Sequence, residues 1–264
     1  MALDTNRLVR ETFVARVEHH SVLGSTNDRA KQCAVANSGP LPLLIVADQQ
    51  TAGRGRGANR WWTGCGSLAL SLLLDGRTWG PQPAVGPLLS LAAAVAVSQL
   101  VAPLLPGQSV GIHWPNDVFA AGKKLAGILV EVPPGGLYVV GAGLNLNNSL
   151  REGPEELQST AVSLLDLTGR QHDRTDFIVL LLERFASLLN DLSHATDGIC
   201  QRANALCLQR GKTLSVATAG KTLRGVCRGI APDGALLLDT PKGLERVVSG
   251  VVLRGELADF EKGR

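Results

Sequence analysis

Residues 50–62 gather three glycines, three arginines and two tryptophans. Glycines let the backbone turn tightly and bring its N–H groups close to an anion. Arg54, Arg56 and Arg60 can fork onto phosphate or carboxylate oxygens, and Trp61 offers a flat face on which a base can stack. These are components of a site for an activated nucleotide. The same composition also fits an exposed basic loop or a single-stranded nucleic-acid arm.

A second group of polar residues follows Trp114. Pro115 fixes the end of a strand, so Asn116 and Asp117 project from a rigid turn, where such a pair can hold a metal or a hydroxyl group. Lys124 begins an apolar run, and partial burial would set its ammonium beside an anion. Gly127 within that run leaves room for close approach of a ligand. The alternative is an ordinary turn before a core strand with exposed lysines.

Common nucleotide and hydrolase motifs are missing. The glycines at 53–57 and 141–143 lack the third glycine of a dinucleotide-binding loop. Gly220-Lys221-Thr222 resembles the end of a P-loop, but Ser215 stands where the opening glycine belongs. There is no Gly-x-Ser-x-Gly elbow. None of the five histidines has an obvious nucleophile beside it, so a structural or surface role is expected for each.

Helices and strands that could position these groups are readable in the first 200 residues. The cap cluster Ser25-Thr26-Asn27-Asp28 predicts a helix that runs to Asn37. Apolar runs and helical spacing predict the other elements. These are strands at 43–47, 67–74, 110–114, 124–131 and 137–143, and helices at 88–101 and 173–192. The last two strands are expected to form a hairpin around Pro133-Pro134-Gly135-Gly136.

The sequence changes character after Leu208. Short β-like segments at 214–216, 225–230, 235–238 and 247–253 alternate with turn clusters. We therefore predict two domains, a larger one at 1–209 and a small β-domain at 210–264. A domain of about 55 residues is marginal on its own, so it is expected to lean on the larger one.

Composition excludes several classes of protein. Hydrophobic residues make up 45% and charged residues 19%, which is globular and not disordered composition. A net charge of +3 is too small for a nucleic-acid footprint. Five scattered cysteines without Cys-x-x-Cys spacing suggest neither a disulfide framework nor a zinc site. We expect a cytoplasmic protein, since no signal peptide is readable at the N-terminus.

One uncharged stretch, from Thr78 to Asn116, could be mistaken for a membrane span. Ser90, Ser98 and Pro103 interrupt it, and it lacks flanking basic clusters. A helix buried in the core of the domain is the better interpretation, so no membrane is expected as a partner.

Taken in order, these motifs resemble those of biotin protein ligases, and the resemblance covers nearly the whole chain. The blocks that carry it are 25–28, 50–61, 114–117 with 124–131, and 141–147. The segments 225–230 and 234–238 resemble the family's small SH3-like domain. Only about 20 residues precede Ser25. The similarity is therefore to the single-function form, which lacks the helix-turn-helix domain of the repressor type.

The resemblance implies an α+β fold. It consists of a mixed-sheet catalytic domain of the class II synthetase-like biotin/lipoate ligase type and a C-terminal SH3-like barrel. The implied function is ATP-dependent biotin–protein ligation through biotinyl-5′-adenylate. Mg²⁺ is implied by the polyphosphate of ATP. The implied partner is a biotin carboxyl-carrier protein of a carboxylase, with no nucleic acid. The family contains both monomers and homodimers.

The resemblance also assigns roles to residues. Catalytic roles fall to Lys124, Arg54, Arg56 and Asp117. Biotin binding falls to Ser25, Thr26, Asn27, Gln50, Arg54, Gly55, Arg56, Lys124 and Gly127. Nucleotide binding falls to Arg56, Trp61, Asn116, Lys124 and Asn145. The Ser-Thr-Asn trio would meet the ureido ring, the arginines and the lysine would meet the two reacting anions, and Asp117 would orient or deprotonate the acceptor amine.

Two alternatives stay open. A lipoate or octanoate ligase or transferase of the same superfamily fits less well, because the polar trio at 25–27 suits a ureido ring better than a bare acyl chain. A non-catalytic ligand-binding or nucleic-acid-binding module would use the arginine loop electrostatically. One residue departs from the family pattern, since Ala58 stands where a glycine is usual. If that position needs a positive φ, alanine costs roughly 1 kcal/mol.

Overall fold

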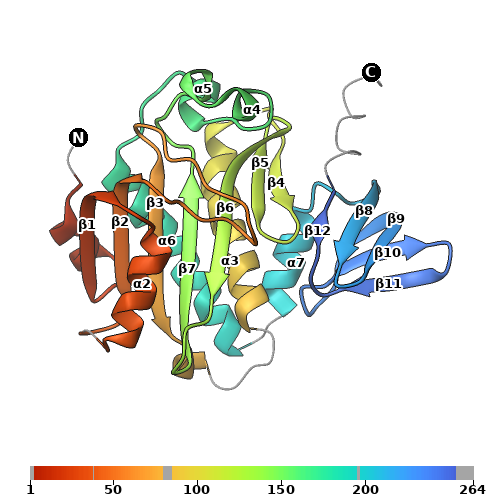
Figure 1. Cartoon of the computed structure of the whole chain (residues 1–264), viewed down its shortest axis with the longest axis horizontal. Helices are drawn as coiled ribbons and strands as arrows, with labels where there is room; N and C mark the ends of the chain where they lie inside the picture. The colour runs from red at the N-terminus through yellow and green to blue at the C-terminus, as the bar shows by residue number, and fades with distance from the viewer. Residues whose placement is uncertain (1–2, 38, 80–84, 195–196, 254–264) are drawn as a thin grey trace.

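A seven-stranded mixed sheet forms the larger part of the computed structural model, which describes residues 3–37, 39–79, 85–194 and 197–253 (Figure 1). The strand order is β1-β2-β3-β7-β6-β5-β4. Strands β1 and β2 are parallel, and the other pairs are antiparallel. The strand bounds are β1 Arg16–Leu23, β2 Leu43–Gln50, β3 Leu68–Asp75, β4 Val110–His113, β5 Asp117–Ala120, β6 Lys123–Glu131 and β7 Leu137–Leu144.

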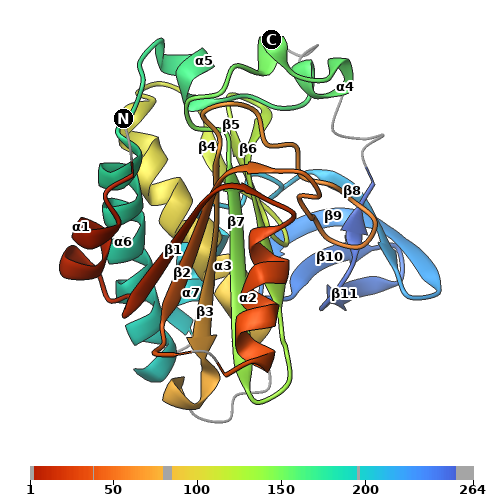
Figure 2. The ribbon, with the colours of Figure 1, turned by 60° about the vertical axis from the view of Figure 1, so that its left-hand side comes forward.

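Helices cover both faces of this sheet (Figure 2). In β2, Leu44 and Val46 join the main core with α3 (Val85–Val101) and α6 (Arg174–His194), whereas Leu43 and Ile45 pack with Ala30 of α2 (Thr26–Val35). Alternate residues of a strand point to opposite faces, so a run that is apolar at every position is buried on both. The remaining helices are α1 Thr5–Glu11, α4 Glu155–Gln158, α5 Leu164–Thr168 and α7 Asp197–Ala205, with 3₁₀ turns at Gly76–Trp79, Ala102–Leu104 and Leu150–Glu152.

The predicted core helix at 88–101 is confirmed and starts three residues earlier, at Val85. The segment Val85–Leu104 is apolar and long enough to cross a membrane by length and composition, with a mean hydropathy of 1.9. Inside the molecule 78% of it is buried. Helix α3 packs against strands β4 to β7 on one side and helix α6 on the other, which accounts for its apolar surface all round.

Two strands of the large sheet were not predicted. Strand β1 lies at the sheet edge and carries polar residues such as Glu18, His19 and His20, so it shows no apolar run. Strand β5 has only four residues and is joined to β6 by the turn Ala121-Gly122. The predicted hairpin of β6 and β7 is confirmed.

The C-terminal strands form a separate antiparallel sheet in the order β11-β10-β9-β8-β12. Their bounds are β8 Thr213–Thr218, β9 Lys221–Ile230, β10 Leu236–Thr240, β11 Gly243–Val247 and β12 Val251–Val252. The prediction of one strand over 247–253 was wrong, because a turn at Ser249 divides it between β11 and β12. The domain boundary at 209/210 stays a prediction, and residues 254–264 lie outside the described part.

Candidate active site

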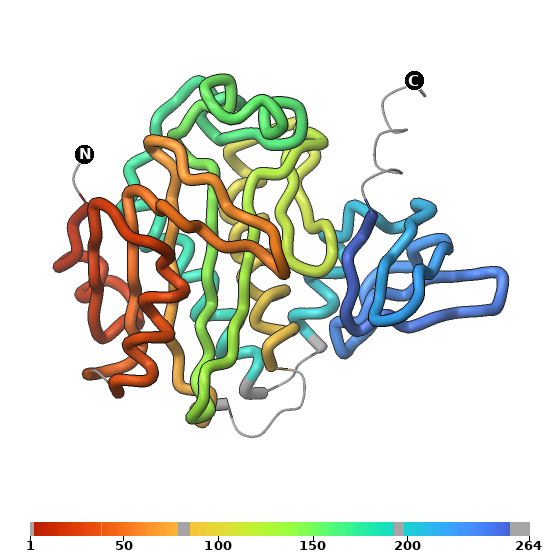
Figure 3. Tube along the Cα trace, in the orientation of Figure 1, coloured from red at the N-terminus to blue at the C-terminus, as the bar shows by residue number. Residues whose placement is uncertain are grey.

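The loop after β2 crosses the face of the large sheet (Figure 3). A cavity of about 1180 Å³ is lined by this loop and by the sheet. Its walls come from the start of α2, residues 49–63, the turn before β5, and strands β6 and β7. All predicted site residues line it: Ser25, Thr26, Asn27, Gln50, Arg54, Gly55, Arg56, Trp61, Asn116, Asp117, Lys124, Gly127 and Asn145. Segments that are far apart in sequence therefore meet in one place.

One end of the cavity is a buried polar network at the start of α2. Ser25 is the N-cap residue, but its hydroxyl makes no capping hydrogen bond to the helix. Gln50, at the end of β2, accepts at Oε1 from the Thr26 backbone N–H at 2.9 Å and lies 3.2 Å from the Thr26 hydroxyl. Ser25, Thr26 and Asn27 are each less than 5% exposed. This end is therefore preorganised to hydrogen-bond a polar ligand group.

Sequence reasoning missed Ser71, a fully buried residue in the middle of β3. Its hydroxyl lies 2.8 Å from Thr26 Oγ1 and 2.7 Å from Asn27 Oδ1. Gly141 of β7 is paired with Ser71 in the sheet, and a Cβ on Gly141 would lie 2.0 Å from Asn27 Oδ1. The available signal was a lone serine inside the apolar run Leu68–Leu74, since an unpaired hydroxyl in a core strand is costly.

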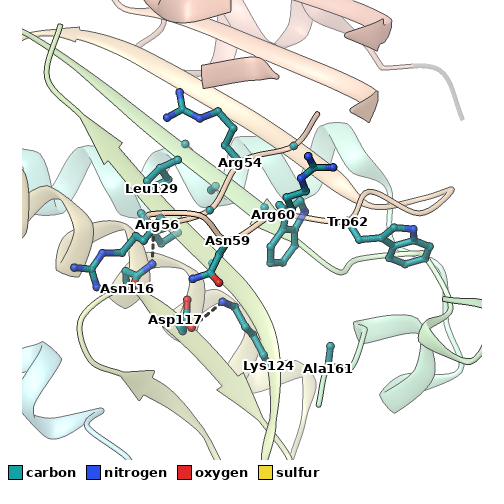
Figure 4. A pocket seen from close by; sticks show the side chains of 18 of the residues that line it. Arg54, Arg56, Asn59, Arg60, Trp62, Asn116, Asp117, Lys124, Leu129 and Ala161 are labelled. Carbon is teal, nitrogen blue, oxygen red and sulfur yellow. Dashed lines mark hydrogen bonds and ion pairs between the residues drawn. The ribbon is translucent and has the colours of Figure 1, made fainter. Parts of the chain in front are cut away.

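The middle of the cavity holds the pair formed by Lys124 and Asp117, whose Nζ and Oδ2 atoms are 2.7 Å apart (Figure 4). Lys124 lies near the start of β6 and Asp117 begins β5, so the sheet itself fixes their separation. A Cβ on Gly127 would lie 3.3 Å from Lys124 Cε and 3.4 Å from Asp117 Oδ1. The space left by Gly127 is thus occupied by this ion pair. Asp117 Oδ1 is buried and meets no donor among the described residues.

Beyond the ion pair lies Trp61, with Lys124 Nζ 5.9 Å from its ring centroid. Its indole ring packs flat on the backbone of β7, where a Cβ on Gly143 would lie 2.3 Å from it. The indole Nε1 is buried and has no acceptor in the described part of the chain. Asn145 is buried nearby, with its Oδ1 accepting from Asn148 Nδ2 at 3.1 Å. This end combines an aromatic shelf with fixed polar atoms.

The two loop arginines point in different directions. Arg54 turns away from Lys124, and its Nη1 lies 2.7 Å from Asp28 Oδ1 and 3.0 Å from Glu131 Oε1 (Figure 4). The hydrogen bond to Asp28 raises the pKa of Arg54 above its ordinary value. Arg56 Nη1 instead donates to the carbonyl of Gly250 at 3.2 Å. Burial lowers the pKa of Arg56, although Asp117 offsets part of this effect.

The turn of the arginine loop shows whether Ala58 has a positive φ. Gly55 N donates to the Asn59 carbonyl at 2.8 Å, which closes the loop between them. Gly57 has a φ of +63°, whereas the φ of Ala58 is not positive. The left-handed position is therefore filled by a glycine, and Ala58 carries no backbone cost.

Asn116 holds the turn before β5 against β6. Its Nδ2 donates to the Ile128 carbonyl at 2.7 Å, and the Ile128 N–H donates back to the Asn116 carbonyl at 2.9 Å. The amide oxygen is thus the part of this side chain that a ligand can meet. Within the described ranges, no three His, Cys, Asp or Glu side chains gather closely enough to hold a metal ion.

Comparisons with known proteins identify the family of the chain. The model of the biotin/lipoate A/B protein ligase family matches residues 21–147, and that of the biotin protein ligase C-terminal domain matches residues 211–255. The bifunctional ligase/repressor of Bacillus subtilis is 34% identical over 97% of this chain and 77% of that protein. The biotin–acetyl-CoA-carboxylase ligase of Mycobacterium tuberculosis is 35% identical over 82% of this chain and 80% of that protein.

Solved structures give the same result. The biotin protein ligase of Aquifex aeolicus in complex with biotin and ATP matches with a TM-score of 0.77 and 26% identity, covering 90% of this chain and 97% of that chain. The first family model spans the start of α2, the arginine loop and the Lys124 strand, and the second spans the C-terminal sheet. On sequence and fold together, the chain belongs to the biotin protein ligase family.

Proposed function

We propose that this chain activates biotin with ATP to form biotinyl-5′-adenylate and then transfers the biotinyl group to a lysine of a biotin carboxyl-carrier protein. The observation that carries the proposal is the continuity of the cavity. A buried hydrogen-bonding network, the ion pair of Lys124 and Asp117, and the Trp61 ring all line this one cavity, with Lys124 Nζ 5.9 Å from the ring centroid. These are the contacts that a ureido ring, the two reacting anions and an adenine would need.

In the first step, a biotin carboxylate oxygen would bond to the α-phosphorus of ATP while the bond to pyrophosphate breaks. Two anions must meet, so fixed cations in a water-poor site lower the barrier. Lys124 is placed to bridge them. Arg54 and Arg56 would bind the carboxylate and the α-phosphate. Each arginine is held by protein groups in this structure, so substrate anions would have to compete with those partners.

In the second step, the acceptor lysine amine would attack the biotinyl carbonyl and release AMP. The amine must lose a proton to do so, and Asp117 is the carboxylate placed to orient or accept it. Among the described residues, the buried Oδ1 of Asp117 has no hydrogen-bond donor. Trp61, Asn116 and Asn145 would hold the nucleotide.

Mg²⁺ fits this site as part of the nucleotide and not as a resident ion. Mg²⁺ usually keeps several waters and is bound by one or two carboxylates plus substrate phosphates. The described residues offer no cage of three ligating side chains, but Asp117 and the amide oxygen of Asn116 border the cavity. When bound, the ion would neutralise charge on the polyphosphate.

The proposal extends to the setting of the protein. No disulfide joins Cys33, Cys65, Cys200, Cys207 or Cys227 in the described part of the chain, which suits the reducing cytoplasm. We place the domain boundary at 209/210, so that residues 1–209 carry most of the cavity lining and the C-terminal domain adds residues 251–253 and the Gly250 carbonyl. The acting unit would be a monomer or a homodimer, and neither nucleic acid nor a membrane is needed for the reaction.

The direct test is the intact mass of a purified carrier domain after incubation with the chain, ATP and Mg²⁺. Biotin, lipoate and octanoate are offered in separate tubes, with a lipoyl domain as a second acceptor. An ATP-dependent addition of one biotinyl group supports the proposal. Addition of only lipoyl or octanoyl would assign the chain to the sister activity. No addition in any tube would favour a ligand-binding module.

Lys124→Ala tests the centre of the site. It should lower the rate of adenylate formation by at least about 10²-fold, the scale for removing one electrostatic contact in a preorganised site. Lys123→Ala is the matched control, because Lys123 Nζ lies on the surface and donates to the Gln158 carbonyl at 3.1 Å. Equal loss in both variants would refute the assigned role of Lys124.

A further inference from the structure

We propose that Glu131 is a positioning residue for biotin recognition, which fixes the Asn27 amide in one orientation and anchors the arginine loop beside it. This proposal rests on the proposed function. Glu131 is the last residue of β6, its side chain is 19% exposed, and it does not line the cavity. It therefore acts through the residues that it holds.

Three donors from two segments, helix α2 and the arginine loop, converge on the Glu131 carboxylate. Asn27 Nδ2 donates to Oε2 at 2.9 Å, Lys31 Nζ lies 2.9 Å from Oε1, and Arg54 Nη1 lies 3.0 Å from Oε1. Burial alone would raise the pKa of Glu131, but the bonds from Asn27 and Lys31 bring it below the ordinary value. The carboxylate is thus ionised at neutral pH and accepts from all three.

Two acceptors set which way the Asn27 amide faces, and Glu131 provides the shorter and the charged contact. Asn27 Nδ2 lies between Glu131 Oε2 and the Leu129 carbonyl at 3.3 Å, and both of these atoms can only accept hydrogen bonds. The NH₂ group must therefore face them. Its two protons are used, so the amide oxygen, which accepts from Ser71 at 2.7 Å and lies against Gly141, is the polar atom of this side chain left for a ligand in the cavity that Asn27 and Gly141 line.

An amide oxygen that accepts from Ser71 keeps one lone pair for a ligand. Asn27 can therefore recognise only a donor, and the ureido ring of biotin carries two N–H donors. An acyl chain has no such donor and would leave the second lone pair of this buried oxygen without a partner, which is a basis for discrimination. If the amide were free to turn over, its NH₂ group would face the ureido N–H and repel it. Fixing the amide is thus part of specificity.

Glu131 also closes a ring of alternating charges. Asp28 lies 2.9 Å from Lys31 Nζ and 2.7 Å from Arg54 Nη1, and Glu131 contacts the same two cations. This ring ties the arginine loop to α2 and β6. Asp28 supports the ring, whereas the Asn27 amide bonds to Leu129, Glu131 and Ser71. Asp28→Asn is therefore the matched control, because it weakens the ring of charges without removing a contact to the Asn27 amide. A substitution of Glu131 affects both the ring and the amide.

The test measures biotin binding to the full chain by calorimetry without ATP, and the KM values for biotin and ATP in adenylate formation. Glu131→Gln should raise the Kd and KM for biotin about tenfold, the scale of one hydrogen bond to a charged group. The KM for ATP should change less than twofold. Asp28→Asn should change biotin affinity less than threefold. Equal effects of both variants on biotin would overturn the proposal, as would unchanged biotin affinity in Glu131→Gln.

Glu131→Asp provides a second variant that keeps the charge. Lys31 and Arg54 are long enough to follow a shorter carboxylate, whereas Asn27 is fixed in the first turn of α2. This variant should therefore fold, keep the ring and still lose biotin affinity by about tenfold. In an Asn27→Ala background, neither substitution should weaken biotin binding further, and an additive loss would refute the role. If the wild-type protein binds biotin but forms no adenylate, the proposed function is wrong. The variants can still be compared by calorimetry, because that measurement uses no ATP.

Discussion

Three glycines determine how closely side chains approach one another in the cavity. A Cβ on Gly141 would strike the Asn27 amide, one on Gly143 would strike the Trp61 ring, and one on Gly127 would crowd the ion pair of Lys124 and Asp117. None of the three has a positive φ. Their function is to provide space, because each lies on a strand directly beneath a side chain of the site.

Gly57 differs from these glycines because its backbone conformation is the constraint. Its φ is +63° and a Cβ there would meet nothing within 4 Å. Gly57→Ala should therefore cost about 1–2 kcal/mol in the closed loop without any clash. We expect the KM for ATP to rise about threefold to tenfold as that loop conformation is depopulated. Ala58→Gly is the control and should stay within about twofold in the same assay, and a larger effect at 58 than at 57 would contradict the assignment.

His113 provides a prediction about pH. It stacks on Phe119 with ring centroids 3.7 Å apart, and burial, reinforced by Lys212 and Lys124, lowers its pKa to about 4. Between these two pKa values, the histidine of the unfolded chain, with a pKa near 6.5, is protonated, whereas that of the folded chain is neutral. Stability therefore falls as pH drops from about 6.5 toward 4.

At pH 5 this difference amounts to about 2 kcal/mol. His113→Phe keeps the ring stack and removes the titration. The loss of unfolding free energy between pH 7 and pH 5, measured by urea denaturation, should be smaller in the variant by about that amount. Identical losses in the two proteins would show that His113 does not control acid stability.

At the scale of elements, the sequence predicts those helices and strands whose burial is visible in their own residue pattern. The buried runs of β2 and β3 and the helix α3 are apolar at nearly every position, so the sequence reveals both their type and their burial. Edge strand β1 and the four-residue β5 carry no such signal. The motifs predicted residues that all line one cavity, but Ser71 and Glu131 were not among them, because their hydrogen-bond partners lie 44 and 104 residues away.

The turn between β5 and β6 provides a prediction about stability. Ala121 and Gly122 both have positive φ, 50° and 76°, which is the two-residue hairpin turn that favours Asn-Gly. Alanine in the left-handed region costs roughly 1 kcal/mol more than asparagine or glycine. Ala121→Asn should therefore raise the free energy of unfolding by about that amount and leave the KM values unchanged. Thermal and urea denaturation measure this change in stability. A lowered Tm of the variant would contradict the turn conformation assigned to residues 121 and 122.

At the scale of the whole molecule, the C-terminal sheet is attached through the edge strand β4. The Ile112 N–H donates to the Leu206 carbonyl at 2.7 Å, and the Leu208 N–H donates to the Ile112 carbonyl at 3.0 Å. Trp114 Nε1 then reaches the Gly234 carbonyl at 2.9 Å. These contacts close the free edge of the large sheet and bring Gly250 to the arginine loop. The small sheet thus completes the cavity.

Gly111 is the position where this attachment can be broken selectively. A Cβ there would lie 2.3 Å from the Leu206 carbonyl oxygen and 2.8 Å from Leu208 Cγ, so Gly111→Ala must push the connecting segment away from β4. Gly86→Ala is the control, because nothing lies within 4 Å of a Cβ at that position. Hydrogen exchange followed by mass spectrometry should show faster exchange in residues 213–252 of Gly111→Ala.

The central strand β7 should keep its protection in that variant, because its hydrogen-bonded partners are β3 and β6 and not β4 or the connecting segment. The small sheet is marginal by itself, so loss of its attachment should allow it to open without unfolding the larger sheet. The KM for ATP should rise, since Arg56 loses the Gly250 carbonyl that holds it in place. Uniformly faster exchange across both sheets would show instead that the two sheets unfold as one cooperative unit.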